Sequence, residues 1–590
     1  MPCASTWMLS SIYRHSGCGN RPAEAICYNE ACSPRPGHTL LLPSHGSIAG
    51  KPITFIMRDV IPVIDLFAGP GGLGEGFSSF LSSQGLRQFR IGLSVEMEAF
   101  AHQTLTLRSF YRQFPTRDRV PDAYYQYLQG RISLEQLARH CPSEMAAARH
   151  EALRAELGTT QNGHIYNRIN QALSSGRRRR NAPWVLIGGP PCQAYSTMGR
   201  SKLRNLLGEN FEKDSRHRLY REYLKILVRF RPSVFVMENV KGMLSASLDG
   251  QPVFQRVISD LRDPFQAVPE SHQRAGGRRV RYRVFSLTNR REDMDPEHYL
   301  IEAERFGIPQ MRHRVILVGV REDIGLSPRL LAPHAAPVTA RQVLQDLPAI
   351  RSQLSKHALN PPDSPEAWPE RVRAALQSSW FQQLRIGGGK SDLTLDLTGA
   401  SELVEALEQA ASDCSAHVNP GAEFMPGEVR PQYRPDWFAD PRLGGVCNHT
   451  ARAHMAEDLQ RYLFIACYGK IHGYSPKLRH LPDGLLPDHK NVRADVFNDR
   501  FRVQVADLPA TTIAAHISKD GHYNIHYDPS QCRSLTVREA ARLQTFPDDY
   551  FFEGPRTAQY RQVGNAVPPL LAWQIAGVVH ELLERTHGAD

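Results

Sequence analysis

The sequence predicts a doubly wound α/β fold that is interrupted by a smaller second domain. Apolar runs of strand length lie at residues 60–67, 90–95 and 184–187, and each run ends in glycine-rich or polar residues. Such continuous apolar runs are typical of parallel strands that are buried on both faces. The carboxyl ends of parallel strands meet at one edge of a sheet, where ligands gather in open α/β folds. We therefore expect the functional groups at that edge.

The composition is that of a globular protein with an excess of positive charge. The chain has 590 residues, of which 41% are hydrophobic and 22% are charged, as in ordinary globular proteins. Its formal net charge of +11, rich in arginine, is common among proteins that handle nucleic acid, although charge alone proves little. No apolar run approaches the length of a membrane span and no signal peptide is evident, so no membrane partner is expected. Ten cysteines are too few for a disulfide scaffold, and a reducing cytoplasm is the expected compartment.

Residues 1–57 differ from the rest of the chain. They contain four cysteines but show no helical or strand period, and they include no Cys-x-x-Cys pair of the kind that binds zinc. We expect a disordered tail, or upstream sequence translated in error ahead of Met57, and no metal site.

A glycine-rich turn follows the first strand. Gly69, Gly71 and Gly72 precede a helix that should run to about residue 81, and glycines in such a turn let a ligand lie against bare backbone. The turn alone is a weak signal, because nucleotide, dinucleotide and methyl-donor sites share it. Glu96 ends the next strand, where a doubly wound fold places the acid that binds ribose hydroxyls; the alternative is a solvated loop carboxylate. No Walker lysine follows the glycines, so a triphosphate is not expected.

Cys192 stands at the end of a third strand, directly after Gly188-Gly189-Pro190-Pro191. A lone cysteine in a strand-end turn is usually inert. A thiol on a stiff Pro-Pro support, however, suits covalent catalysis, which needs the sulfur fixed within attacking distance of an electrophilic carbon.

Further polar groups flank two more strands. Glu238 follows the apolar run 233–237, whereas Arg312 and Arg314 precede the run 315–320. An acid at a strand end is commonly structural, and alternating arginines on an edge strand are commonly solvated. In a parallel sheet, Glu238 would share a cleft with Cys192 and the glycine turn. The two arginines join that cleft only if their strand runs antiparallel to its neighbours.

Together, these motifs resemble those of the cytosine-5 DNA methyltransferases. The matching segments are residues 65–72, 189–193, 238–240, 310–314, 533–547 and 562–569, in the order that the family shows. On this resemblance the chain is identified as a member of the family, of a bacterial restriction-modification or solitary type. The resemblance implies a Rossmann-like methyltransferase sheet interrupted by a smaller target recognition domain.

The resemblance also implies a reaction and the roles of residues. The family transfers a methyl group from S-adenosylmethionine to carbon 5 of cytosine, after the thiolate of Cys192 adds to carbon 6 of the ring. Glu238 would hold ring N3 and the exocyclic amine, and Arg314, with Arg312 as partner, would hold ring O2 or the thiolate region. The donor-binding residues that the resemblance implies are Phe67, Gly69, Gly71, Gly72, Glu96 and Asn565.

Two features depart from the family pattern, and both concern the adenine pocket. The family usually places an aspartate, which meets the donor adenine, on the strand before the nucleophile strand. Here residues 110–183 form a long arginine-rich insertion in which no equivalent can be located. Met97, rather than an aromatic residue, follows Glu96.

Four parts are expected along the chain. They are the N-terminal extension 1–57, the first part of the catalytic domain 58–325, the target recognition domain 326–505 and the C-terminal part of the catalytic domain 506–590. The helix after Pro569 should return to the first motif and bring Asn565 near the donor. We expect residues 199–218 to form a mobile loop over the flipped base, and the arginine run 177–180 to be solvated.

The expected partner is double-stranded DNA, from which the target cytosine must be flipped out. We expect a monomer and, in a restriction-modification setting, a cognate restriction endonuclease. Two alternatives stay open. A transfer-RNA methyltransferase could use the same framework, but the long recognition interval favours duplex DNA. A DNA-binding regulator with a dead catalytic domain would be expected to lose Cys192 or Glu238, and both are present.

Overall fold

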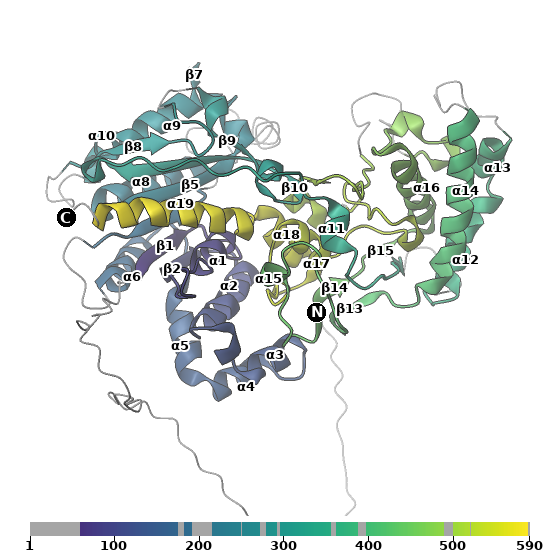
Figure 1. Cartoon of the computed structure of the whole chain (residues 1–590), viewed down its shortest axis with the longest axis horizontal. Helices are drawn as coiled ribbons and strands as arrows, with labels where there is room; N and C mark the ends of the chain where they lie inside the picture. The colour runs from purple at the N-terminus through teal and green to yellow at the C-terminus, as the bar shows by residue number, and fades with distance from the viewer. Residues whose placement is uncertain are drawn as a thin grey trace, which may run out of the picture. The chain divides into compact units, whose positions relative to one another are not determined.

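The computed structural model describes residues 60–174, 182–190, 215–248, 250–271, 279–291, 295–355, 362–386, 397–488, 500–519 and 521–587. Their main feature is an eight-stranded sheet with helices on both faces (Figure 1). The strands are β1 (Ile61–Leu66), β2 (Phe89–Glu96), β3 (Ala152–Arg154), β4 (Val185–Gly188), β5 (Val234–Val240), β8 (Tyr282–Phe285), β9 (Leu300–Glu302) and β11 (His313–Arg321).

The order of the strands is β3-β2-β1-β4-β5-β11-β8, with β9 paired to β11. Strands β3, β2, β1, β4 and β5 run parallel to one another. Strand β11 runs antiparallel to β5, β8 and β9. The predicted doubly wound fold is confirmed, and the antiparallel β11 meets the condition for bringing its arginines to the same edge as Glu238.

Both faces of the sheet are buried, as the apolar runs predict. Successive side chains of a strand point to opposite faces, and in β1 Val63 belongs to one core while Ile64 belongs to the other. The first core includes α1 (Gly72–Ser78) and α19 (Pro569–His587). The second includes α6 (Asn162–Ser174), α8 (Ser215–Phe230) and α9 (Val253–Arg262).

Helix α19 packs along α1, so the C-terminal helix does return to the first motif (Figure 1). A side chain at Gly76 would lie 2.4 Å from Cβ of Ala572, so only glycine permits this approach. Helix α1 ends at Ser78, earlier than the predicted residue 81. The stretch Arg556–Thr586 is long and apolar enough to cross a membrane by composition, but 78% of its most apolar window is buried in the fold, as in a core helix.

The insertion at residues 110–183 is a helical layer of its own. It contains the end of α2 (Ala99–Arg112), then α3 (Asp122–Leu128), α4 (Leu134–His140), α5 (Pro142–Glu151), strand β3 and helix α6. Phe110, Tyr124, Leu137 and Met145 form an apolar core that also includes Leu443 and Cys447 of a later segment. The insertion therefore supplies the strand that precedes β4, which the sequence does not reveal because β3 has only three residues.

The interval 326–505 contributes to three different cores, one of which, through Leu443 and Cys447, is the core of the insertion. Its helices α12 (Ala367–Arg373), α13 (Ser379–Arg385), α14 (Leu397–Asp413) and α16 (Ala456–His472) share a core of their own, which includes Trp368, Leu407 and Phe464. Trp437 and Phe438 instead pack in the core of the sheet. Part of the interval is thus tied to the catalytic framework.

The remaining elements connect these parts. They include α11 (Ala340–Leu344), α17 (Val537–Leu543), α18 (Arg556–Asn565) and the short strands β10 (Gln310–Met311), β12 (Gln353–Leu354), β13 (Gly421–Pro426), β14 (Gly445–Thr450), β15 (Ala453–His454) and β16 (Ala510–Thr511).

Candidate functional site

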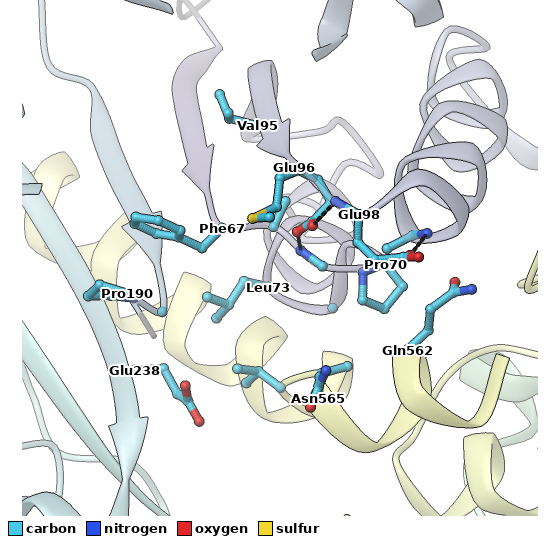
Figure 2. A pocket seen from close by; sticks show the side chains of 18 of the residues that line it. Phe67, Pro70, Leu73, Val95, Glu96, Glu98, Pro190, Glu238, Gln562 and Asn565 are labelled. Carbon is cyan, nitrogen blue, oxygen red and sulfur yellow. Dashed lines mark hydrogen bonds between the residues drawn. The ribbon is translucent and has the colours of Figure 1, made fainter. Parts of the chain in front are cut away.

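A cavity of about 410 Å³ lies at the carboxyl ends of the parallel strands. Its walls are the β1–α1 turn, the residues that follow β2, β3 and β4, the end of β5, and helix α18. Figure 2 shows Glu96 and Phe67 on one side of the cavity, Pro190 and Glu238 on another, and Asn565 and Gln562 approaching from α18. Within the described ranges, no group of three or more His, Cys, Asp or Glu side chains is placed to hold a metal ion.

The glycine turn shapes one wall of this cavity. Phe67, Gly69 and Gly72 line it, whereas Gly71 does not. Gly71 has a φ of 102° and its absent side chain points at Leu105 and the Tyr550 hydroxyl, so it is needed for the turn itself. Gly72 lies against the backbone of Val567, where an added Cβ would come within 2.3 Å of the carbonyl oxygen.

Glu96 fixes the turn through both carboxylate oxygens. One oxygen accepts from the backbone N–H of Gly69 at 2.8 Å, and the other accepts from the N–H of Glu98 at 2.7 Å (Figure 2). Burial raises the pKa of Glu96, while these backbone bonds act in the opposite direction. Because each carboxylate oxygen has a second lone pair, the side chain can still accept from a ligand hydroxyl in the cavity.

Glu156 is an acidic residue at the cavity that the sequence analysis did not identify. It follows β3, the strand before β2 in the sheet order, and it lines the cavity with Ala155 and Leu157. Its side chain is exposed and its backbone N–H donates to Gln161 at 2.8 Å. Only the parallel pairing of β3 with β2 brings this residue to the cavity, since β3 has no strand signal of useful length.

Glu238 lies within β5 on the opposite wall of the cavity. Gly189 allows its close approach, because a Cβ at Gly189 would lie 2.9 Å from Oε2 of the glutamate. The other oxygen, Oε1, is 3.0 Å from Nε of Arg314 in the antiparallel β11. The structure therefore brings Arg314 to Glu238, and the guanidinium holds the carboxylate from behind the cavity.

Arg312 points elsewhere. It is 2% exposed and its guanidinium donates to the carbonyl oxygens of Ile513, Gly564 and Ala566 at 2.9, 3.2 and 2.8 Å. Its own N–H donates to the carbonyl of Gln310 two residues earlier, at 2.8 Å, and this tight turn breaks the alternation of side chains before β11. Arg312 does not line the cavity, unlike the role expected of it beside Arg314.

Cys192 lies outside the described residues, as do residues 177–180 and most of the segment 199–218. The described chain reaches Pro190 on the cavity wall, two residues before the cysteine. The side-chain amide of Asn239, next to Glu238, donates to the carbonyl of Pro190 at 3.5 Å.

Asn565 ends α18 and lines the cavity, although almost 500 residues separate it from the glycine turn. Gln562, Arg561 and Ala558 of the same helix line the cavity as well. Gln562 accepts from the buried hydroxyl of Thr104 in α2 at 2.7 Å, which fixes α18 against α2 beside the cavity. The resemblance implied a role for Asn565 and included Gln562 in the segment 562–569 without a role, whereas Arg561 was not predicted.

Comparison with known proteins matches this architecture. The family model of the C-5 cytosine-specific DNA methylases matches residues 162–264 and 290–581, more than half of the chain. The chain belongs to this family.

Its relatives include bacterial and archaeal enzymes. Type II methyltransferase M.Bpa9945I of Bacillus paralicheniformis is 34% identical over 543 residues, covering 89% of this chain and 100% of the relative. Type II methyltransferase M.AgeI of Thalassovita gelatinovora is 26% identical, with 88% of this chain and 98% of the relative covered. DNA (cytosine-5-)-methyltransferase M.ApeKI of Aeropyrum pernix is 24% identical, with 68% and 81% covered.

As a C-5 cytosine-specific DNA methylase, the chain is a DNA (cytosine-5-)-methyltransferase, and its substrate is DNA. Enzymes of this family use S-adenosylmethionine, which agrees with a cavity built on a glycine turn and an acid at the end of the next strand. The names of the relatives agree with a restriction-modification setting.

Proposed function

We propose that this methyltransferase methylates carbon 5 of cytosine in a specific double-stranded DNA sequence, through a covalent adduct between Cys192 and the flipped base. The observation that carries the proposal is the Glu238–Arg314 pair, 3.0 Å apart, in which Glu238 lines the cavity and Arg314 lies behind it. Gly189 and Pro190, which lead directly to Cys192, line the same wall. The acid, the cation and the approach to the thiol therefore converge on one cavity.

Carbon 5 of cytosine is a poor nucleophile, so the ring must be activated before carbon 5 can accept a methyl group. An enzyme nucleophile that adds to carbon 6 provides this activation. Addition of the Cys192 thiolate to carbon 6 makes the ring enamine-like, so that carbon 5 can attack the methyl group. Loss of the carbon 5 proton and departure of the thiolate then restore the aromatic ring. A free cysteine has a pKa of about 8.5 and is mostly thiol at neutral pH, so a neighbouring guanidinium such as that of Arg314 favours the reactive form.

Glu238 activates the ring for this addition. Its carboxyl group, hydrogen-bonded to ring N3 and to the exocyclic amine, would draw charge from the ring as the thiolate adds. Arg314 holds Oε1 of Glu238 and donates from Nη1 to its neighbour's carbonyl, that of His313, at 2.8 Å. A guanidinium carries five N–H donors, so the same group can also donate to ring O2.

The donor-side residues fit S-adenosylmethionine, which supplies the methyl group when it is bound. Glu96 is placed to accept from the ribose hydroxyls, and Glu156, which follows the neighbouring strand β3, to accept from the adenine amine. Phe67 offers an apolar wall. Gly69 and Gly72 leave backbone exposed on the cavity wall, where Leu73 and Leu157 also lie, and Asn565 closes the site from α18.

Arg312 is assigned a positioning role in this proposal, because its guanidinium bonds backbone carbonyls instead of facing the cavity. Gly71 is assigned to the turn and not to the donor. DNA reading is assigned to residues 326–505, whose helical core is separate from the sheet. We also propose that the enzyme acts as a monomer and protects DNA from a cognate restriction endonuclease.

Covalent trapping tests the proposal. Bisulfite sequencing of DNA from a host that expresses the chain gives the target site, and a duplex with 5-fluorocytosine at that site then traps the adduct. We expect a denaturation-stable complex with the wild type and none with Cys192→Ser, which should still bind DNA and S-adenosylhomocysteine. Cys141→Ser is the matched control, since Cys141 lies in the helical insertion and away from the cavity.

Two results would contradict the proposal. One is substantial turnover by Cys192→Ser, because a serine hydroxyl is a far weaker nucleophile at neutral pH. The other is methylation of transfer RNA with no methylation of duplex DNA in parallel assays.

A further inference from the structure

A buried polar network joins the end of the recognition interval to the helix that closes the donor cavity. Its centre is the guanidinium of Arg312, with three backbone carbonyls as acceptors. One acceptor, Ile513, lies in the segment that leaves the interval 326–505. The other two, Gly564 and Ala566, flank Asn565 on the cavity wall. One side chain therefore joins the segment that directly follows the recognition interval to the donor side.

Two buried glutamines reinforce this junction. Gln310 accepts from the N–H of Ile513 at 2.8 Å and donates to the side-chain oxygen of Gln544 at 2.8 Å. Gln544 in turn donates to the carbonyls of Val563 and Ala566 at 2.8 and 3.0 Å. Both glutamine side chains are fully buried. The amides thus run parallel to Arg312 and link the same two segments.

The network continues into the recognition interval itself. Gln504 accepts from the N–H of Thr511 at 2.8 Å, and β16, which contains Thr511, pairs with β10. The hydroxyl of Thr512 donates to the carbonyl of Met311 at 2.5 Å. A displacement of the interval is therefore transmitted to the segment that Arg312 holds.

On the donor side, the same segments are in close backbone contact. An added Cβ at Gly564 would lie 2.3 Å from the nitrogen of Ala515, so α18 and the segment after Ile513 touch directly. Val567, which follows Ala566, touches Gly72 of the glycine turn in the same way. The segment after Ile513, the end of α18 and the glycine turn are therefore in direct backbone contact, one after the other.

A buried cation that is solvated only by carbonyls depends on all of them at once. Burial, with Arg314 nearby, lowers the pKa of Arg312, which shows how little solvation its charge retains. If either segment moves, the buried charge loses backbone acceptors, which is costly in a buried site. The hydrogen bonds of Arg312 therefore favour one arrangement of the segment after Ile513 relative to the end of α18.

We propose that Arg312 is a positioning residue that couples DNA recognition to donor binding, by locking the segment 510–518 onto the end of α18. This inference rests on the proposed function, because it takes the cavity as the donor site and residues 326–505 as the DNA reader. Bound DNA that fixes the recognition segment then also fixes Asn565 and Val567, and donor affinity rises. By linkage, bound donor raises DNA affinity by the same factor.

The experiment measures that factor directly. S-adenosylhomocysteine is titrated calorimetrically into free enzyme and into enzyme saturated with a duplex that carries the site found by bisulfite sequencing. The ratio of the two dissociation constants is the coupling factor, which we expect to be about 5- to 150-fold in the wild type. In Arg312→Lys, which keeps the charge but cannot reach both segments, we expect the factor to fall close to one.

Arg538→Lys is the matched control. Arg538 is also fully buried and also donates to three carbonyls, those of Cys447, Pro547 and Tyr550, at 2.6 to 2.9 Å. None of these three residues lines the cavity. Its replacement should lower the thermal stability as Arg312→Lys does, yet leave the coupling factor at the wild-type value.

Three outcomes would overturn the inference. They are a wild-type factor of one, a wild-type factor in Arg312→Lys, and an equal loss of the factor in Arg538→Lys. If Arg312→Lys does not fold, Thr512→Val decides, since that exposed side chain can be changed without disturbing the core: a reduced factor supports the inference and an unchanged one refutes it. Failure of the proposed function would look different, because S-adenosylhomocysteine would then not bind the free wild type or no adduct would form.

Discussion

Arg314 and Glu238 hold each other across two antiparallel strands, with Nε of the arginine 3.0 Å from Oε1 of the glutamate. In the register of β11 and β5, Arg314 faces Val240 and Ile316 faces Glu238, so the ion pair is diagonal. Only 15% of the glutamate side chain is exposed. One carboxylate oxygen is thus occupied by the arginine while the other lies against Gly189 at the cavity wall.

We expect Arg314→Lys to lower kcat by about 100-fold or more, as loss of a charge-positioning donor does in other active sites. A lysine keeps the charge but cannot hold Glu238 and a ring oxygen together. The affinity for S-adenosylhomocysteine should be unchanged, because Arg314 does not line the cavity. Arg321→Lys, in the same strand and paired with Asp323, is the control and should keep its activity. A wild-type kcat in Arg314→Lys would remove Arg314 from the mechanism.

Glu96→Ala should weaken binding of S-adenosylhomocysteine about 10- to 100-fold, because a charged acceptor of ribose hydroxyls is lost. Glu156→Ala should weaken it less, since Glu156 is exposed. Isothermal titration of each variant is the measurement, with Glu135→Ala in α4 as an exposed control far from the cavity. Equal affinities in all four proteins would place the donor elsewhere.

Asp65 should make stability depend on pH. Burial raises its pKa to about 8, and both of its oxygens are buried without a hydrogen-bond partner in the described structure. Because the folded-state pKa lies above the unfolded value, the folded protein binds the extra proton, and stability falls as the pH rises from about 4 to about 8. The loss is at most about 1.4 kcal/mol per pH unit.

Asp65→Asn removes this charge, so its melting temperature should fall less between pH 6 and pH 8 than that of the wild type. Thermal unfolding by circular dichroism at several pH values is the measurement. Asp507→Asn, at a surface ion pair with Arg341, is the control and should follow the wild-type curve. Parallel curves for Asp65→Asn and the wild type would show that Asp65 is ionised in the folded protein.

Grafting the recognition interval should transfer the target sequence. Residues 326–505 of a relative with another target replace those of this chain, except the residues that pack in the core of the sheet, among them Val343, Trp437 and Phe438. Bisulfite sequencing should then show the relative's target, and loss of a single base contact should cost about 1–3 kcal/mol of discrimination at one base pair. An active chimera that still methylates the original site would place recognition outside the interval.

The sequence predicted the parts of the site that are local. A glycine turn, an acid at a strand end and a cysteine after two prolines are each encoded within a few residues, and the structure places Phe67, Gly69, Gly72, Glu96, Glu238 and Asn565 around one cavity. Glu156 escaped prediction because β3 is too short to give a strand pattern and is recognised only by its pairing with β2.

The sequence by itself thus determined the fold class, the family and the strand ends that carry the chemistry, because apolar runs and turn residues act over short distances. Only the tertiary structure decided which of two similar arginines reaches Glu238. Arg314 lies inside a regular antiparallel strand and reaches the glutamate diagonally, whereas Arg312, two residues away, lies in a tight turn that directs it into the core. A spacing of two predicts a shared face only where the strand is continuous. Here the strand is not continuous at Arg312. Its guanidinium instead binds the carbonyl groups of Ile513, Gly564 and Ala566, which packing brings to it from more than 200 residues away in the sequence.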